Sequence, residues 1–258
     1  MPFIHANELT TFYRLDGPAE APALMLAHPL GANSEIWAAQ VDALARRSRL
    51  LRYDLRGHGQ TEVPDGPYDV ATLAADAAGL VDALGLERVS FVGASLGSLV
   101  GLALAQTRPD RVAKLVLLGA RARFGPARAL EQRAATIAEG GVAAIVKATL
   151  ERWLTPAFHA RQPEVVESIR DMLLAAPKTG YLGALAAVRD ADFSASPLPV
   201  TAPTLVMTGR DDATAPPEAA EALAAAIPGA EFAVLAGAHL ANVEDPDTFN
   251  ARVLAFCE

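Results

Sequence analysis

Gly93-Ala94-Ser95-Leu96-Gly97 is the stretch of sequence that decides the fold. In this Gly-x-Ser-x-Gly pattern, small residues around the serine permit a tight turn from a strand into a helix, which exposes the serine hydroxyl. The surroundings agree, because the strand-like Arg88 to Val92 precedes the motif and the helix-like Leu96 to Gln106 opens within it. We therefore predict a nucleophilic serine at a strand end. A glycine-flanked serine in an ordinary turn is the alternative.

Strand-like and helix-like segments alternate on both sides of this motif. The first fifteen residues suggest an antiparallel pair, Pro2 to His5 and Leu9 to Arg14. The segments that follow are strands at Ala23 to Ala27, Arg49 to Tyr53 and Lys114 to Leu118, and helices at Glu35 to Arg46 and Val70 to Leu84. This order predicts an α/β protein with a mostly parallel central sheet and helices on both faces. With a serine at the strand-to-helix turn, it predicts the α/β-hydrolase fold.

The alternation stops between Arg121 and about Ser196. Residues 130–139, 142–154, 165–175 and 181–188 have helical patterns, and we find no good strand candidate among them. The sheet resumes at Thr204 to Met207, and the remaining segments are a helix at Glu218 to Ala226, a strand at Glu231 to Leu235 and a helix at Pro246 to Phe256. We predict a helical cap, residues 121–196, inserted between two parts of a hydrolase core, residues 1–120 and 197–258.

Composition limits the classes of function. With 52% apolar and 20% charged residues the chain can bury a large core. A net charge of −8 without a run of Lys or Arg argues against a nucleic-acid or anionic-membrane partner, so we expect a small-molecule substrate. The uncharged Val89 to Thr107 is long enough for a membrane span, but its glycines and serines and its β-rich start indicate a buried strand and helix instead.

Two features bear on the compartment. The N-terminal residues have neither a basic start nor an apolar segment, so we expect no export signal. The single cysteine, Cys257, cannot form an internal disulfide. Both features favour the cytoplasm.

A serine hydroxyl needs a neighbouring base, and in α/β-hydrolases the chain order is serine, acid, histidine. Only His159 and His239 follow Ser95, and His159 lies within the predicted cap. His239 follows the last predicted strand, where the base is expected. We predict His239 as the base, with a lone surface histidine as the alternative.

The acid must hold the imidazole in one tautomer and stabilise its charged form. Asp212 lies beyond a strand end with the spacing Gly-x-x-Asp-x-x-x-Pro, and Asp211 is the reserve candidate. After the preceding strand, at Gly119 and Ala120, there is no carboxylate. We predict Asp212 as the acid. A role in a turn or a helix cap is the alternative.

The oxyanion of acyl transfer needs two backbone donors. One is expected at the N–H of Leu96, directly after the serine. The other is expected from His28-Pro29-Leu30-Gly31, where proline has no N–H and Leu30 is the favoured donor. His28 either organises this loop or is purely structural.

A second polar cluster, Tyr53 to Gly59, contains Asp54, Arg56 and His58. We interpret it as a scaffold whose polar groups bond one another. No His-Glu-x-x-His motif and no cysteine pair supports a zinc site, and no Gly-x-Gly-x-x-Gly follows the first parallel strand. We therefore expect neither a metal nor a nucleotide cofactor.

Several motifs together resemble the 3-oxoadipate enol-lactonases of aromatic-compound breakdown over nearly the whole chain. They are His28-Pro-Leu-Gly, the Tyr53 to Gly59 block, Gly66-Pro-Tyr-Asp, the Ser95 motif, Arg152-Trp153, Tyr181, Ala187-Val-Arg-Asp190 and Ala238-His-Leu-Ala-Asn-Val-Glu244. The resemblance implies that an enol-lactone ring is opened through an acyl-serine intermediate.

The chain departs from the family pattern at three places, which we expect to border the pocket. His28-Pro29 stands where the family has Asn-Ser, Ser98 stands where it has glycine, and Leu118 to Phe124 differs from the usual Asn-Thr-Ala version. Pocket residues tune substrate choice by small energies. The fold and triad are expected to survive these changes, while selectivity for one lactone is open.

The family's substrate carries a carboxylate, so a cation in the pocket is informative. Arg121 and Arg123 follow a strand end and are candidates for pairing with an acid; solvent-exposed loop charge is the alternative. Phe124 and Trp153 are candidates for an apolar pocket wall, or for cap core.

Lactone or ester hydrolysis is therefore the leading hypothesis. A broad carboxylesterase, another lactonase, a carbon-carbon bond hydrolase and a perhydrolase are alternatives within the enzyme class. A ligand receptor on a hydrolase fold is the alternative outside it. Homodimers are common among such enzymes, but the sequence has no decisive apolar stripe.

Overall fold

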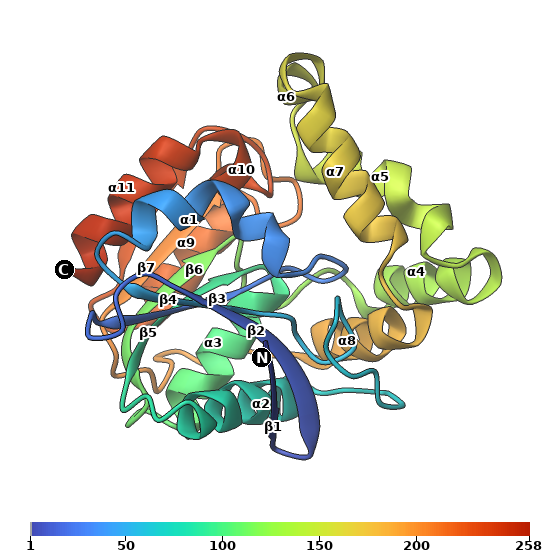
Figure 1. Cartoon of the computed structure of the whole chain (residues 1–258). Coiled ribbons are helices and arrows are strands. Elements are labelled where there is room, and N and C mark those ends of the chain that lie inside the picture. Colours follow the sequence, from blue (N-terminus) through green and yellow to red (C-terminus); the bar gives the residue numbers. More distant parts are fainter. Residues whose placement is uncertain (1) are drawn as a thin grey trace.

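An eight-stranded sheet forms the centre of the molecule in the computed structural model, which describes residues 2–258 (Figure 1). Its strand order is β1-β2-β4-β3-β5-β6-β7-β8. The strands are β1 (Phe3–Ala6), β2 (Leu9–Asp16), β3 (Ala23–Ala27), β4 (Arg49–Tyr53), β5 (Val89–Ala94), β6 (Val112–Leu118), β7 (Thr204–Gly209) and β8 (Glu231–Leu235). Strand β2 pairs antiparallel with β1 and β4, and the other neighbours pair parallel. The carboxyl ends of β3 to β8 therefore meet at one edge.

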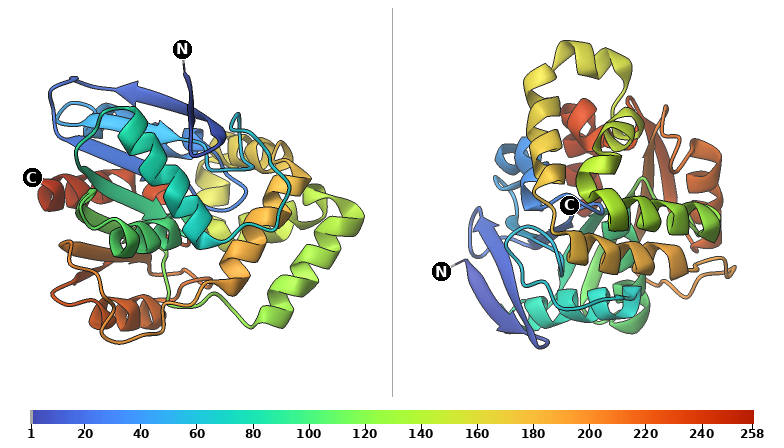
Figure 2. Two further views of the ribbon diagram at one scale, coloured as in Figure 1. Left: turned by 90° about the horizontal axis from the view of Figure 1, so that it is seen from below. Right: turned by 90° about the vertical axis from the view of Figure 1, so that its right-hand side faces the viewer.

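Helices cover both faces of this sheet, as Figure 2 shows. On one face lie α1 (Ala38–Leu44) and α11 (Pro246–Cys257), whose buried Leu44 and Phe249 join one apolar cluster. On the other face lie α2 (Val70–Ala83), α3 (Leu96–Thr107) and α9 (Pro217–Ala226), which join a second cluster. Central strands such as β5 are buried on both faces, which explains their continuous apolar runs. The predicted α/β architecture is confirmed.

Five helices are inserted between β6 and β7, and we call them the helical insertion. They are α4 (Ala127–Gly140), α5 (Val146–Trp153), α6 (Pro156–Arg161), α7 (Pro163–Leu174) and α8 (Lys178–Asp190). Figure 1 shows them gathered to one side of the sheet. Their buried Leu150 and Leu173 belong to the same apolar cluster as Val92 and Leu118 of the sheet. The insertion therefore packs on the core, and a cap spanning 121–196 stays our proposed division of the chain.

The structure refines the predicted helices at several points. The expected helices at 35–46 and 142–154 each begin as a 3₁₀ turn, η1 (Ser34–Trp37) and η2 (Val142–Ile145). Two short helices, α6 and α10 (Ala241–Glu244), went unpredicted because four to six residues are too few to show a helical period. None of the helices between residues 2 and 258 combines the length and apolar character that crossing a bilayer requires.

Candidate active site

Ser95 lies in a sharp turn between β5 and α3. Its φ of 53° and ψ of −111° are unusual for a residue with a side chain and indicate a strained backbone. Close packing makes the flanking glycines necessary, because a Cβ atom at Gly93 would lie 2.2 Å from the oxygen of Gly97. The Ser95 N–H donates to the oxygen of Leu118 at 2.8 Å, which anchors the turn to β6. The motif therefore has the structural context that a nucleophilic serine requires.

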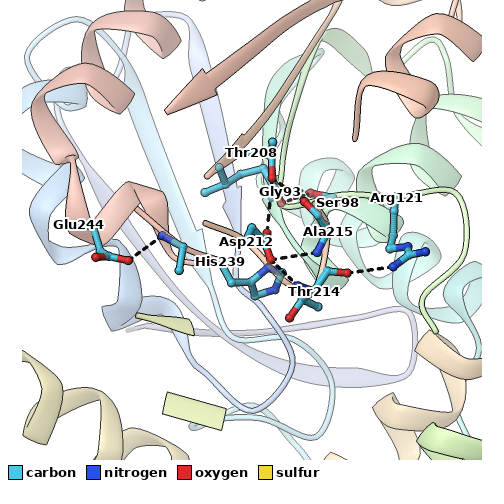
Figure 3. Close-up of polar contacts among 11 residues, drawn as sticks. Gly93, Ser98, Arg121, Thr208, Asp212, Thr214, Ala215, His239 and Glu244 are labelled. Atoms are coloured by element: carbon cyan, nitrogen blue, oxygen red, sulfur yellow. Dashed lines mark hydrogen bonds and ion pairs between the residues drawn. The ribbon is translucent and has the colours of Figure 1, made fainter. Parts of the chain in front are cut away.

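Ser98, in the first turn of α3, stabilises the same strand-to-helix turn. Its hydroxyl is buried near the oxygens of Gly93, at 2.7 Å, and of Leu118, at 3.0 Å (Figure 3). Ser98 does not line the cavity, so the expectation that this departure borders the pocket was wrong. The extra hydroxyl bonds strand ends to the helix instead.

His239 and Asp212 contact each other at the carboxyl edge of the sheet. His239 Nδ1 lies 2.7 Å from Asp212 Oδ2, and both side chains are buried (Figure 3). Asp212 Oδ1 accepts the N–H groups of Thr214 at 2.7 Å and Ala215 at 2.9 Å. Burial alone would raise the pKa of Asp212, but His239 and the two N–H donors outweigh it and hold that pKa below its usual value. The carboxylate is therefore ionised at neutral pH and can orient the imidazole.

The reserve candidate, Asp211, has a different environment. Its side chain is exposed, and its own N–H donates to the oxygen of Gly237 at 2.9 Å. The turn after β7 thus directs Asp211 to solvent and Asp212 inward. Asp212 is the carboxylate that contacts His239.

The two predicted oxyanion donors come from the loop after β3 and from the start of α3. Leu30 lines the cavity that contains Ser95, and Leu96 is the first residue of α3. Within residues 2–258, no backbone or side-chain acceptor takes the N–H of Leu30 or of Leu96. The free N–H of Leu96 at the start of α3 favours negative charge, and a free N–H of Leu30 would be the second donor that an oxyanion site requires.

His28 and His58 fix the loop that carries Leu30. Each donates from Nδ1 to a carbonyl, of Pro29 and Arg56 respectively. Each accepts at Nε2, His28 from the Leu55 N–H at 2.9 Å and His58 from the Gly31 N–H at 3.0 Å. Complete burial is the largest influence on both, and it lowers the pKa of His28 to about 4 and that of His58 to about 3. The contacts agree with the scaffold role expected for the Tyr53 to Gly59 block.

Stability should fall on mild acidification because of these two histidines. Their folded pKa values lie below the ordinary 6.5, so the unfolded chain binds more protons between about pH 6.5 and pH 4. The free energy of unfolding should then fall with pH by about 1.4 kcal/mol per pH unit for each histidine. Urea unfolding at several pH values between 7.5 and about 4.5 measures this slope. A flat profile across that window would contradict it.

A cavity of about 450 Å³ opens beside Ser95 and His239. Of the four predicted pocket residues, Arg121, Phe124 and Trp153 line it. The prediction for Arg123 was wrong: its exposed guanidinium lies 3.4 Å from Asp192 Oδ2 at the surface. The neighbouring backbone is fixed, because the Phe193 N–H donates to the oxygen of Ala122 at 2.9 Å.

Three further polar residues of the cavity went unpredicted as a group: Arg133, Arg152 and Tyr181. Arg133 Nη2 donates to the Tyr181 hydroxyl at 2.6 Å and to Thr149 Oγ1 at 2.8 Å. Arg152 also lines the cavity, and its side chain is exposed. The partial burial of its guanidinium, followed by the charge of Arg133, lowers its pKa. On an amphipathic helix such as α4, Arg133 has the sequence pattern of a solvated charge, so periodicity gave no signal for it.

The cavity is cationic. Arg121 Nη1 donates to the oxygen of Thr214 at 3.2 Å, and Arg133 contacts only neutral oxygens. In the part of the chain that the structure describes, none of Arg121, Arg133 and Arg152 pairs with a carboxylate. Among residues 2–258 there is no group of three or more His, Cys, Asp or Glu side chains that could hold a metal ion. The site thus joins a serine, a histidine–carboxylate pair and unpaired positive charge.

Comparison with known proteins agrees with this architecture. The family model for the alpha/beta hydrolase fold matches residues 22–246. The chain belongs to the α/β-hydrolase fold family. It is 31% identical to 3-oxoadipate enol-lactonase 2 of Acinetobacter baylyi, over 99% of this chain and 98% of that protein. The predicted family, and with it a hydrolase, is confirmed.

Other relatives are similar over comparable lengths. The crystal structure of the enol-lactonase from Burkholderia xenovorans superimposes with a TM-score of 0.96 at 37% identity, covering 99% of both chains. A putative carbamate hydrolase, RutD of Agrobacterium fabrum, is 34% identical over 92% of this chain and 94% of its own. The relatives of this hydrolase therefore include proteins named for two different substrates.

Proposed function

We propose that this hydrolase opens a lactone that carries a carboxylate, of the 3-oxoadipate enol-lactone type, through an acyl-serine intermediate. One observation carries the proposal: Ser95 and His239 line a single cavity in which unpaired arginines supply positive charge. The similarity to two proteins named as enol-lactonases supports the choice of substrate.

The first half of the reaction forms the acyl-enzyme. Ser95 Oγ bonds to the ring carbonyl carbon while its proton passes to His239, and Asp212 stabilises the resulting imidazolium. The N–H groups of Leu30 and Leu96 stabilise the oxyanion. The ring carbon–oxygen bond then breaks, the enol oxygen takes the proton from His239, and the enol tautomerises to a ketone. Because the leaving group stays attached through carbon, the acyl-enzyme carries the whole former lactone.

The second half releases the product. A water molecule bonds to the acyl carbon and gives its proton to His239. The bond from that carbon to Ser95 Oγ then breaks, and the proton returns to the serine. The product carries one carboxylate more than the lactone did.

The arginines give this site its preference for an anion. An arginine that donates to a carboxylate forms a strong, charge-assisted hydrogen bond. Arg133 is held in place by Tyr181 and Thr149, so it is already oriented before the substrate binds. We therefore assign substrate recognition mainly to Arg133, with Arg121 and Arg152 adding positive charge.

Kinetics on a panel of substrates test the proposal. The panel comprises 3-oxoadipate enol-lactone, uncharged γ- and δ-lactones, short p-nitrophenyl esters and a simple carbamate. We expect the highest kcat/KM on the enol-lactone, with the uncharged lactones well behind. Serine-dependent activity confined to the other substrates would keep the hydrolase and overturn the enol-lactone assignment.

Arg133→Met should impair binding of the anionic lactone specifically. Loss of a hydrogen bond to a charged group costs about 1.5–3 kcal/mol, so KM for the enol-lactone should rise roughly 10- to 100-fold. The kcat/KM on an uncharged p-nitrophenyl ester should change by less than about 3-fold. Arg128→Met is the matched control, because Arg128 is exposed on the same helix and does not line the cavity. Equal losses on charged and uncharged substrates would contradict the assignment.

A further inference from the structure

The backbone N–H groups on both sides of His239 donate hydrogen bonds to other segments of the chain. The N–H of Ala238, just before the histidine, donates to Glu244 Oε1 at 2.8 Å (Figure 3). The N–H of Leu240, just after it, donates to the oxygen of Trp153 at 3.0 Å. The imidazole itself is bonded to Asp212, so the side chain and both neighbouring amides have separate partners. The position of His239 thus depends on acceptors outside its own loop.

Glu244 also reaches the helical insertion. Its Oε1 accepts the Thr155 N–H at 3.1 Å, and its Oε2 accepts the Thr155 hydroxyl. Thr155 lies between α5 and α6, two residues after Trp153, and its hydroxyl also accepts the N–H of Phe158 at the start of α6. One carboxylate therefore bonds the histidine loop and the insertion together.

The carboxylate acts here as a hydrogen-bond acceptor. Across residues 2–258, no Lys, Arg or His pairs with Glu244, and its bonded partners are N–H and O–H groups of Ala238 and Thr155. Packing is close as well: a Cβ atom at Gly237, whose φ is +101°, would lie 2.9 Å from the Cβ of Glu244. This fit leaves little room for the loop to shift while the bonds are kept.

The segment that Glu244 holds also forms part of the cavity wall. Arg152 and Trp153 line the cavity, and the Trp153 ring lies 6.5 Å from the His239 ring, centroid to centroid. A displacement of residues 153–155 would therefore move the pocket wall and the histidine loop together. The contacts of Glu244 with Thr155 and Ala238 therefore affect both the cavity wall, where substrate would bind, and the alignment of His239.

We propose that Glu244 is a positioning residue that couples the helical insertion to His239. The proposal rests on the proposed role of His239 as base. Glu244 does not reach the substrate; it acts through the Ala238 N–H on one side and through Thr155 on the other. Small misplacements of a catalytic group cost up to roughly 100-fold in rate, so removing the acceptor should act on kcat.

The test uses four variants of the full chain, Glu244→Ala, Glu244→Gln, Thr155→Val and the double variant Glu244→Ala with Thr155→Val. Glu244→Ala should lower kcat roughly 10- to 100-fold on both the enol-lactone and a p-nitrophenyl ester, with KM changed by less than about 3-fold. Glu244→Gln keeps an amide oxygen for the Ala238 N–H and should restore most of kcat. Glu221→Ala, an exposed residue of α9, is the control.

The coupling between Glu244 and the helical insertion is tested by comparing the single variants with the double variant. Thr155→Val replaces the hydroxyl by a methyl group, which removes the bond to Glu244 Oε2 together with the cap on the Phe158 N–H. It should lower kcat several-fold, yet it should lower kcat no further in the Glu244→Ala background, because the cap on α6 affects stability and not the position of His239. Additive losses would overturn the coupling. So would wild-type kcat in Glu244→Ala or Thr155→Val, even if the urea midpoint falls, because that result describes a merely structural contact. If Glu244→Ala does not fold, Thr155→Val decides the matter, because a several-fold lower kcat supports the coupling and a wild-type kcat overturns it.

The result separates this inference from the proposed function. If the wild type shows no hydrolysis that depends on Ser95, the proposed function fails. If the wild type hydrolyses the lactone and Ser95→Ala does not, while the Glu244 variants keep full kcat, only the coupling fails.

Discussion

Ser95→Ala is expected to lower kcat/KM on the enol-lactone by roughly 10⁴- to 10⁶-fold. The cavity, the two N–H donors of Leu30 and Leu96 and the His239–Asp212 pair all stay in place in this variant. Only the nucleophilic oxygen is lost, so the remaining rate reflects binding and oxyanion stabilisation alone. Initial rates measured by the loss of enol-lactone absorbance give the ratio.

The matched control is Ser194→Ala, which alters an exposed serine away from the cavity. It should keep the wild-type rate. Removing the Ser95 hydroxyl should not weaken the fold, because the bond to the Leu118 oxygen is donated by the backbone N–H of Ser95. A Ser95→Ala variant that retains more than about a tenth of wild-type activity would exclude the acyl-serine mechanism.

Asp212→Asn is expected to have the second largest effect, a loss of roughly 10⁴-fold in kcat. The carboxylate accepts from His239 Nδ1, which leaves Nε2 free to take the serine proton. An asparagine at this position can present an N–H to Nδ1 and stabilise the wrong tautomer, and it no longer stabilises the imidazolium. Measuring kcat of this variant over a range of pH values reports both effects, the wrong tautomer and the less stable imidazolium.

Asp211→Asn is the control for that experiment, since it makes the same chemical change one residue away. Asp211 is exposed and bonds through its backbone, so this variant should keep the wild-type kcat. Equal losses from the two variants would mean that charge near the site matters in general. A loss confined to Asp211→Asn would reverse the assignment of the acid.

The sequence was most informative where a backbone requirement and a chemical requirement coincide. Ser95 needs small neighbours and a strand-to-helix turn, and the apolar runs around it predicted both. His239 could be selected because only one other histidine follows the serine, and it lies in the insertion. The five strands from β3 to β7 also followed from short, largely apolar segments, most of whose residues are buried.

The residues around this core were harder to predict because their roles depend on packing between distant segments. Asp211 and Asp212 differ only in which side of a turn they occupy, and the N–H groups of Thr214 and Ala215 decide that. Arg133 lies on α4 and is recognised as a pocket residue only through Tyr181, 48 positions away. Glu244 likewise contacts Thr155, 89 positions away.

Labelling with a serine-directed p-nitrophenyl phosphonate tests the central claim, that Ser95 is the nucleophile activated by His239. We expect one phosphonyl group per chain, located on the peptide that contains Ser95, with hydrolase activity lost in proportion to labelling. His239→Ala should slow the labelling strongly, and Ser95→Ala should abolish it. Full activity on a completely labelled Ser95, or a label on another residue that accounts for the inactivation, would contradict the account.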